Sequence, residues 1–136
     1  MKRVFLDTNF IIDYFVREDY AGDAEKVMML GDSMNMEFCI SYLTVANFAY
    51  IMRKSPADKL KTLISRICEV FTVVSNTKNQ ILLNLQEQVS DFEDGLQYQA
   101  AVYAGCDCMI TRNKKDFQFA EIPVFTPEEF LIYFKG

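Results

Sequence analysis

Residues Val4 to Ile12, with the sequence VFLDTNFII, place three polar side chains between two apolar segments. The first segment is typical of a short buried strand, and the residues from Asn9 onward have apolar side chains at helical spacing. Asp7 therefore falls where a strand ends and a helix begins. One explanation is that Asp7 or Thr8 only caps that helix. The other is that the carboxylate belongs to a site at the edge of a sheet.

The same alternation of short apolar runs and longer amphipathic segments continues along the chain. Strands are expected at residues 3–6, 38–41, 70–74, 108–111 and 124–125. Helices are expected at residues 9–16, 21–36, 42–53, 56–68 and 77–88, after Ser90 as far as about Gly105, and from 127 onward, with a polar loop or short helix at 112–117. This order indicates an α/β fold with a parallel sheet covered on both faces.

A chain of 136 residues is expected to form a single domain over 1–136, large enough to bury a core without disulfides. Its longest apolar run, Ile64 to Val74, is interrupted by Arg66 and Glu69, so no membrane span is expected. The basic start is followed by too few apolar residues for a signal peptide. The sequence therefore predicts a cytoplasmic protein.

The sequence contains no histidine, which excludes a Ser-His-Asp triad, a Cys-His pair and a nuclease that uses histidine as acid and base. The four cysteines are expected to be reduced thiols in the core, and without histidine they make a poor zinc site. A net charge of −5 argues weakly against a general polyanion-binding surface. Hydrolysis by this chain would have to depend on carboxylates, lysines or a metal ion.

Several oxygen-bearing side chains follow expected strands or lie near the expected carboxyl edge of the sheet, where parallel sheets bind ligands. They are Asp7, Asp94, Asn113 and Asp116. Each has a simpler explanation, because Asp and Asn are also common at helix starts, on solvated helix faces and in turns. Together, however, they would crowd like charges in one cleft, which is unfavourable unless protons or a divalent cation neutralise them. Oxygen ligands of this kind select Mg²⁺ or Mn²⁺.

Two neighbours of Asp94 are interpreted separately. Asp91 lies three positions before Asp94 and shares its helix face. Glu93 lies three positions after Ser90, the spacing of a capping box, and is therefore expected to be a helix-start residue without a catalytic role.

Four segments carry an ordered set of motifs: Asp7-Thr8-Asn9, Ser41 to Thr44, Asp91 to Gln97, and Ile110 to Phe117. Together they resemble the PIN-domain family, and the resemblance covers the chain from Val4 to about Phe134. It implies a Rossmann-like three-layer α/β/α fold with a central parallel sheet of about five strands. It also implies a Mg²⁺- or Mn²⁺-dependent endoribonuclease of the kind found as the toxin in bacterial toxin–antitoxin pairs.

The resemblance also implies roles for single residues. Asp7 matches the first metal-binding acid of the family and Asp94 the third. Asn113 and Asp116 match the fourth acidic segment. The expected metal ligands are these four residues, and the expected catalytic carboxylates are those of Asp7, Asp94 and Asp116.

Supporting positions follow from the same resemblance. Thr8 and Asn9 are expected to orient the first acid or hold water, and Asp91 to assist the third. The second family acid should be a glutamate on the helix after the second strand, but Asn47 occupies that place. Asn47 offers a carbonyl oxygen without a negative charge, so metal affinity is expected to be lower.

Contacts with RNA are assigned to cations and one aromatic ring. Arg112, Lys114 and Lys115 flank the expected site, with further help from Arg53 and Lys54. Tyr42 is positioned to stack a base. Cleavage by similar enzymes implies products with a 5′-phosphate and a 3′-hydroxyl.

Two alternatives remain open at this stage. The first is a PIN-like module that has lost hydrolysis through Asn47 and only binds RNA or a partner protein. The second is an aspartyl-phosphate protein with Asp7 as nucleophile, although Asn9 stands where such proteins need a second Asp. The expected partners are an RNA substrate, an antitoxin protein and a second copy of the chain.

Overall fold

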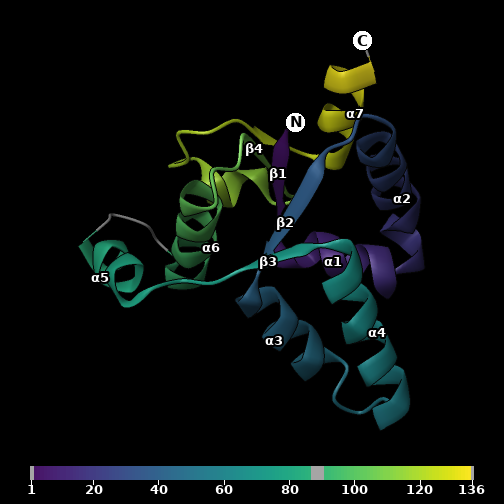
Figure 1. The fold of residues 1–136 in the computed structure, drawn as a ribbon. Coiled ribbons are helices and arrows are strands. Elements are labelled where there is room, and N and C mark those ends of the chain that lie inside the picture. The colour runs from purple at the N-terminus through teal and green to yellow at the C-terminus, as the bar shows by residue number, and fades with distance from the viewer. Residues whose placement is uncertain (1, 87–90, 136) are drawn as a thin grey trace.

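The computed structural model describes residues 2–86 and 91–135, which contain a five-stranded parallel sheet in the order β3-β2-β1-β4-β5 (Figure 1). The strands are β1 (Arg3–Leu6), β2 (Glu37–Ser41), β3 (Thr72–Val74), β4 (Cys108–Ile110) and β5 (Val124–Phe125). The expected α/β architecture is confirmed. The strand order reverses at β1, which pairs with β2 on one side and β4 on the other.

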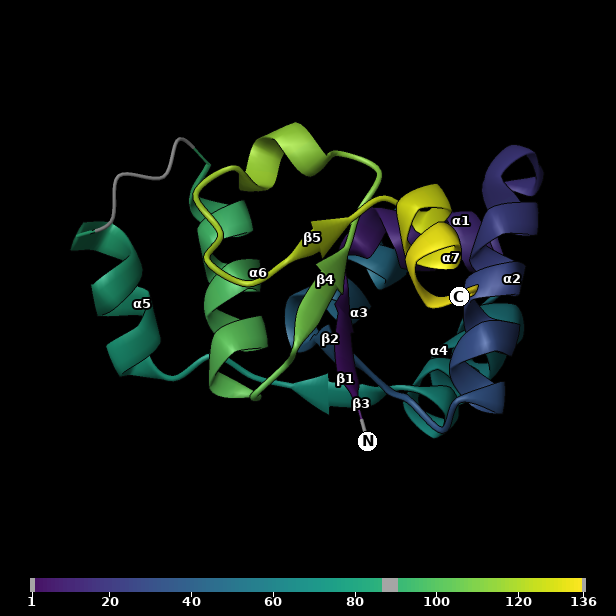
Figure 2. The ribbon, with the colours of Figure 1, turned by 90° about the horizontal axis from the view of Figure 1, so that it is seen from above.

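Helices cover both faces of the sheet (Figure 2). They are α1 (Thr8–Phe15), α2 (Glu18–Ser33), α3 (Tyr42–Ile51), α4 (Ala57–Val70), α5 (Lys78–Gln86), α6 (Phe92–Tyr103) and α7 (Pro127–Lys135), with a 3₁₀ helix, η1, at Lys114–Phe117. None of these described helices is long and apolar enough to cross a bilayer.

Alternation along β1 divides the core into two layers. Val4 and Leu6 face the core that α1, α2, α3, α4 and α7 share, whereas Phe5 packs with residues of α6 and η1 on the other face. All three side chains are fully buried. Since a strand buried on both faces needs apolar residues at every position, the continuous run before Asp7 is explained.

Most element boundaries agree with the expectations to within a few residues. Gly105 has a positive φ of 71° and ends α6, as its sequence position suggested. The prediction of a strand at 70–74 is wrong at its start, because Val70 is the last residue of α4 and the strand begins at Thr72. α2 also begins earlier than expected, at Glu18. Cys68 is exposed on α4, which corrects its assignment to the core.

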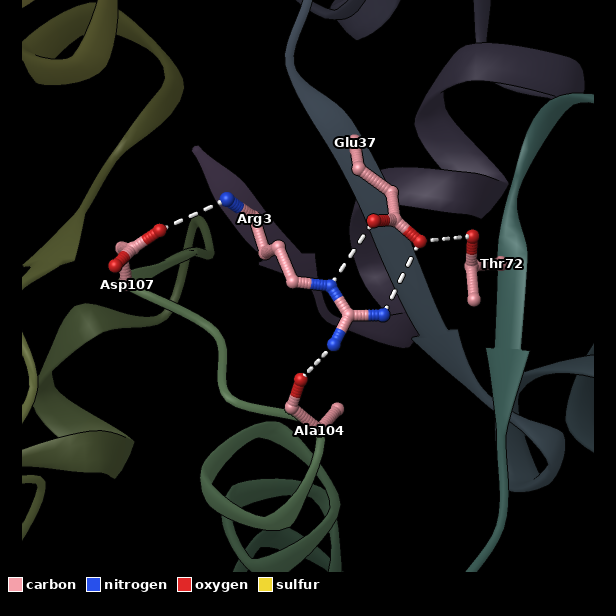
Figure 3. A network of polar contacts seen from close by, with 5 residues as sticks. All are labelled: Arg3, Glu37, Thr72, Ala104 and Asp107. Carbon is pink, nitrogen blue, oxygen red and sulfur yellow. Dashed lines mark hydrogen bonds and ion pairs between the residues drawn. The ribbon is translucent and has the colours of Figure 1, made fainter. Parts of the chain in front are cut away.

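Arg3 is the centre of a network of polar contacts at the amino edge of the sheet (Figure 3). The acids were expected at the opposite, carboxyl edge. Its guanidinium donates to both carboxylate oxygens of Glu37 on β2, at 3.0 and 3.1 Å, and to the carbonyl oxygen of Ala104. Glu37 also accepts a hydrogen bond of 2.7 Å from Thr72 on β3, and Asp107 accepts one of 2.9 Å from the Arg3 backbone. Arg3 thus joins β1 to β2 and to the turn before β4, and Glu37 extends the network to β3.

Two glycines of α2 differ in the space around them, and replacing each with alanine tests how closely this helix packs on the sheet. At Gly22 an added Cβ would meet nothing within 4 Å, so Gly22→Ala is expected to stabilise the protein by about 0.5–1 kcal/mol through helix propensity. At Gly31 the same atom would overlap the buried ring of Phe38, so Gly31→Ala is expected to destabilise it by about 1–3 kcal/mol. Urea unfolding of both variants measures the difference, and equal stabilities would contradict this packing.

Candidate active site

The site lies at the carboxyl edge of the sheet, where the strand order reverses between β1 and β4. Leu6 of β1 is in register with Ile110 of β4, so the residues that follow them, Asp7 and Thr111, come together. On the other side of β1, the strand β2 leads directly into α3. Open parallel sheets bind ligands in the crevice at such a reversal.

Asp7 is both a helix cap and a buried acid. One carboxylate oxygen accepts a hydrogen bond of 3.1 Å from the Phe10 backbone, and the other accepts one of 2.5 Å from the Thr111 hydroxyl. Burial raises the pKa of Asp7 to about 6, although both hydrogen bonds act in the opposite direction. Asp7 therefore caps the helix and also places a buried carboxylate at the edge of the sheet, so the two explanations that the sequence offered are compatible.

A pocket of about 360 Å³ opens beside Asp7. Among the residues singled out from the sequence, it is lined by Asp7, Thr8, Asn9, Asn47, Asp91 and Asp94. Glu93 and Gln97 add polar groups, and Tyr50, Ile51, Ile12 and Phe117 form apolar parts of the wall. Side chains from α1, α3 and α6 thus converge on one hollow.

Asp94 faces this pocket from the first turn of α6. Asp91 caps the helix, and its carboxylate accepts a hydrogen bond of 2.9 Å from the Asp94 backbone. The pKa of Asp94 is raised to about 6, first by burial and then by the negative charges of Asp91, Asp116, Asp7 and Glu93. The crowding of like charges expected from the sequence is present around this carboxyl.

A buried polar cluster connects the three helices behind the acids. The hydroxyls of Thr8 and Thr44 are 2.9 Å apart, and the amide nitrogen of Gln97 lies 3.1 Å from the first and 3.4 Å from the second. Gln97 is 3% exposed, and its side-chain oxygen has no partner among the described residues. This oxygen is therefore an unpaired buried acceptor on a residue that lines the pocket.

Asn47 and Glu93 meet across the pocket. The Asn47 amide donates a hydrogen bond of 2.6 Å to a Glu93 carboxylate oxygen, joining α3 to α6. The interpretation of Glu93 as only the capping partner of Ser90 needs correction, because Asp91 is the cap of α6 and Glu93 lines the pocket. Ser90 itself lies outside the described residues.

The residues that follow β4, from Arg112 to Asp116, contribute less directly to the site than the sequence suggested. Neither Asn113 nor Asp116 lines the pocket, although the Asp116 charge acts on Asp94. The Arg112 guanidinium makes two hydrogen bonds to Asp13, at 2.6 and 3.2 Å. The Lys114 ammonium lies 3.1 Å from both carboxylate oxygens of Glu129. The remaining cation of this group, Lys115, is exposed.

The donor chemistry of the pocket fits a hard divalent cation. Within residues 2–86 and 91–135, no three acid or thiol side chains stand close enough together to hold a metal ion as placed. The pocket nevertheless offers carboxylates from Asp7, Asp94 and Glu93 and an unpartnered buried oxygen from Gln97. Carboxylate and amide oxygens are the ligands that Mg²⁺ and Mn²⁺ prefer.

Sequence reasoning gave Thr44, Thr111, Glu93 and Gln97 no role in the site. Thr111 directly follows a buried strand, as Asp7 does. That shared position could have predicted that Thr111 lies beside Asp7. Gln97 lies three residues after Asp94, on the same helix face. No local pattern distinguishes Thr44 or Glu93, because their contacts come from other elements.

Comparison with known proteins places this geometry in a family. A family model described as PIN domain matches residues 3–115. Ribonuclease VapC1 of Aquifex aeolicus (strain VF5) is 26% identical over 138 residues, which is 95% of this chain and 93% of the relative.

Solved structures agree with the fold. The structure of VapBC-1 from nontypeable Haemophilus influenzae has a TM-score of 0.69 at 20% identity, over 93% of this chain and 98% of that one. A toxin–antitoxin complex from Klebsiella pneumoniae gives 0.68 at 22% identity, over 91% and 97%. Since the family model spans most of the chain, the protein belongs to the PIN domain family.

Proposed function

We propose that this chain is a Mg²⁺- or Mn²⁺-dependent endoribonuclease. The observation that carries the proposal is the meeting of Asp7 and Asp94, from distant segments of the chain, in one pocket at the reversal of strand order. The raised pKa values of both carboxyls, each about 6, indicate a site where positive charge would be favourable. The similarity to the Aquifex ribonuclease supports RNA as the substrate.

In the proposed mechanism, Asp7 and Asp94 would hold the cation, and Asn113 and Asp116 would support it from the β4 side. When bound, a divalent cation supplies Lewis acidity and positive charge beside the scissile phosphate. Thr111 and the Phe10 backbone fix the orientation of the Asp7 carboxylate.

Asp94 is suited to accept the proton of the attacking water. Burial and the neighbouring acids raise the pKa of this carboxyl to about 6 without a cation, and a bound cation would lower it. The carboxylate is therefore ionised at neutral pH and can accept a proton. As water attacks the phosphorus, the bond to the 3′ oxygen breaks, and this oxygen takes up a proton from the solvent. The products are then a 5′-phosphate and a 3′-hydroxyl.

The rim of the pocket suggests where single-stranded RNA would lie. Tyr50 lines the pocket at the end of α3 and is 65% exposed. The Arg53 guanidinium lies over its ring, with the central carbon 4.0 Å from the ring centroid. We infer that Tyr50 stacks a base and Arg53 faces a phosphate, roles that the sequence had suggested for Tyr42 and, in part, for Arg53.

Tyr50→Ala is expected to weaken binding of a short single-stranded RNA by about 5- to 140-fold, because stacking contributes about 1–3 kcal/mol per base. Fluorescence anisotropy with a labelled oligonucleotide in EDTA measures binding without cleavage. Tyr103→Ala, which removes another exposed ring from α6, is the matched control and should leave affinity unchanged. Equal affinities for the Tyr50 variant and the unmodified protein would refute the stacking role.

The central test is cleavage of a defined single-stranded RNA with Mn²⁺ and with EDTA. We expect cleavage only with the metal. We also expect Asp94→Asn to lower the cleavage rate by more than the roughly 100-fold that is typical of removing a residue that only hydrogen-bonds to a metal ligand. Asp32→Asn, which removes an exposed carboxylate outside the pocket, is the control.

Other outcomes would separate the alternatives. RNA binding without cleavage, at any metal concentration, would favour the inactive PIN-like module. Cleavage that persists in EDTA or in Asp94→Asn would contradict the proposed mechanism. Acid-labile phosphate on Asp7 would favour an aspartyl-phosphate protein.

We also propose that the chain is the toxin of a toxin–antitoxin pair. The support is its likeness to the Klebsiella pneumoniae chain, which was solved in a toxin–antitoxin complex. Co-expression with the product of the adjacent gene should give a complex that survives size-exclusion chromatography and suppresses cleavage. Failure of every adjacent gene product to do either would count against this assignment.

A further inference from the structure

The contact between Asn47 and Glu93 places a carboxylate where the sequence lacks one. The family resemblance expects a glutamate at position 47, and the amide of Asn47 cannot supply its charge. In the structure that amide holds a Glu93 carboxylate oxygen at 2.6 Å, on the wall of the pocket that contains Asp7 and Asp94.

We propose that Glu93, oriented by Asn47, replaces the missing glutamate as a cation-binding carboxylate of this site. The inference rests on the proposed function, because it assigns a residue to the same divalent-cation site. The proposal also changes the interpretation of Asn47. Its amide orients the Glu93 carboxylate, so the absence of a glutamate at position 47 is no longer a reason to expect weak metal binding.

The hydrogen bond gives Glu93 a defined direction. An exposed glutamate ordinarily samples several rotamers, and fixing it costs conformational entropy. The Asn47 amide offsets that cost and holds the carboxylate beside α3, where both residues line the pocket. The first turn of α6 is also a favourable place for negative charge, because the helix dipole is positive there.

A second observation points to a ligand in the same place. The side-chain oxygen of Gln97, one turn along α6 from Glu93, is buried without a hydrogen-bond partner among the described residues. Leaving a buried acceptor unpaired is costly, and Gln97 is one of the residues that line the pocket. A hard cation or its bound water would satisfy such an oxygen, which favours positive charge on the part of the wall formed by Glu93 and Gln97.

A purely structural role for Glu93 would give different results. If Glu93 only tied α3 to α6, its removal would lower stability and leave cation affinity intact. If it binds the cation, removing its charge should change affinity even when the fold is unaffected. Glu93→Gln separates the two, because glutamine keeps an oxygen for Asn47 and loses only the charge.

The test is Mn²⁺ binding by isothermal titration calorimetry, with thermal unfolding in EDTA as the check of folding. Glu93→Gln is expected to weaken Mn²⁺ binding by about 10- to 100-fold. The double variant Asn47→Glu with Glu93→Gln returns the charge to α3 and should restore binding to within about threefold. Glu69→Gln, on the exposed face of α4, should change nothing.

Two results would overturn the inference: unchanged affinity in Glu93→Gln, or a folded double variant that binds as weakly as the single one. A failure of the proposed function would give a different pattern of Mn²⁺ affinities among the variants. If the unmodified protein binds Mn²⁺ no better than Asp94→Asn does, the cation site itself is absent and both proposals fail. If Asp94→Asn loses binding but Glu93→Gln does not, only the role of Glu93 is wrong.

Discussion

Asp7→Asn is expected to abolish Mn²⁺-dependent RNA cleavage and, in EDTA at pH 8, to raise the free energy of unfolding by about 1–3 kcal/mol. The two effects have opposite signs because the same carboxylate would bind the cation and is held ionised in a buried position. Asparagine keeps the cap on α1, since it accepts the Phe10 hydrogen bond as well as aspartate does.

The pH dependence of this gain follows from the pKa of Asp7, which is about 6 in the folded protein against an ordinary value of 3.8. Between about pH 4 and pH 6 the folded state therefore binds more protons than the unfolded state. The stability of the unmodified protein falls as pH rises through that window. The advantage of Asp7→Asn should be greatest above pH 6 and should vanish below about pH 4.

Urea unfolding at pH 4, 6 and 8 in EDTA measures this difference. Asp13→Asn is the matched control, because Asp13 lies on α1, which Asp7 caps, and is also buried but receives two hydrogen bonds from Arg112. That variant is expected to lose stability, by about 1.5–3 kcal/mol, since it weakens hydrogen bonds between charged groups. An Asp7→Asn protein that still cleaves, or that is less stable than the unmodified chain at pH 8, would contradict this account.

The sequence predicted the sheet well, for a physical reason. A strand buried on both faces needs an unbroken apolar run, and the run from Val4 to Leu6 and its counterpart at Cys108 to Ile110 have little competing interpretation. Val70 shows the limit of that reasoning. Its β-branched side chain suits a strand, but tertiary context keeps it in the last turn of α4.

The site was predictable where the backbone determines it. Asp7 directly follows β1 and Asp94 lies in the first turn of α6, so their positions come from the elements themselves. The direction of a long side chain depends instead on partners from elsewhere in the fold. Arg112 turns to Asp13, which is 99 positions away in the sequence, and Lys114 turns to Glu129 on another helix. Glu93 turns to Asn47 for the same reason.

Thr111 is the residue whose importance comes entirely from such a contact. Its fully buried hydroxyl donates to Asp7 at 2.5 Å and accepts from the Asn113 backbone at 3.0 Å. A hydrogen bond to an ionised carboxylate favours the charged form, so this hydroxyl lowers the pKa of Asp7 against the effect of burial. It therefore helps to keep the first acid ionised and correctly oriented.

Thr111→Val keeps the shape of the side chain and removes the hydroxyl, so Mn²⁺ affinity and cleavage at pH 7 should fall by about 10- to 100-fold. Because the pKa of Asp7 should rise, the acid limb of the pH–rate profile should move to higher pH, and the activity deficit should narrow as pH increases. Thr111→Ser keeps the donor and should retain both affinity and profile. A uniform loss at every pH would mean that Thr111 acts only through packing, since a packing defect does not change which protonation state of Asp7 is present.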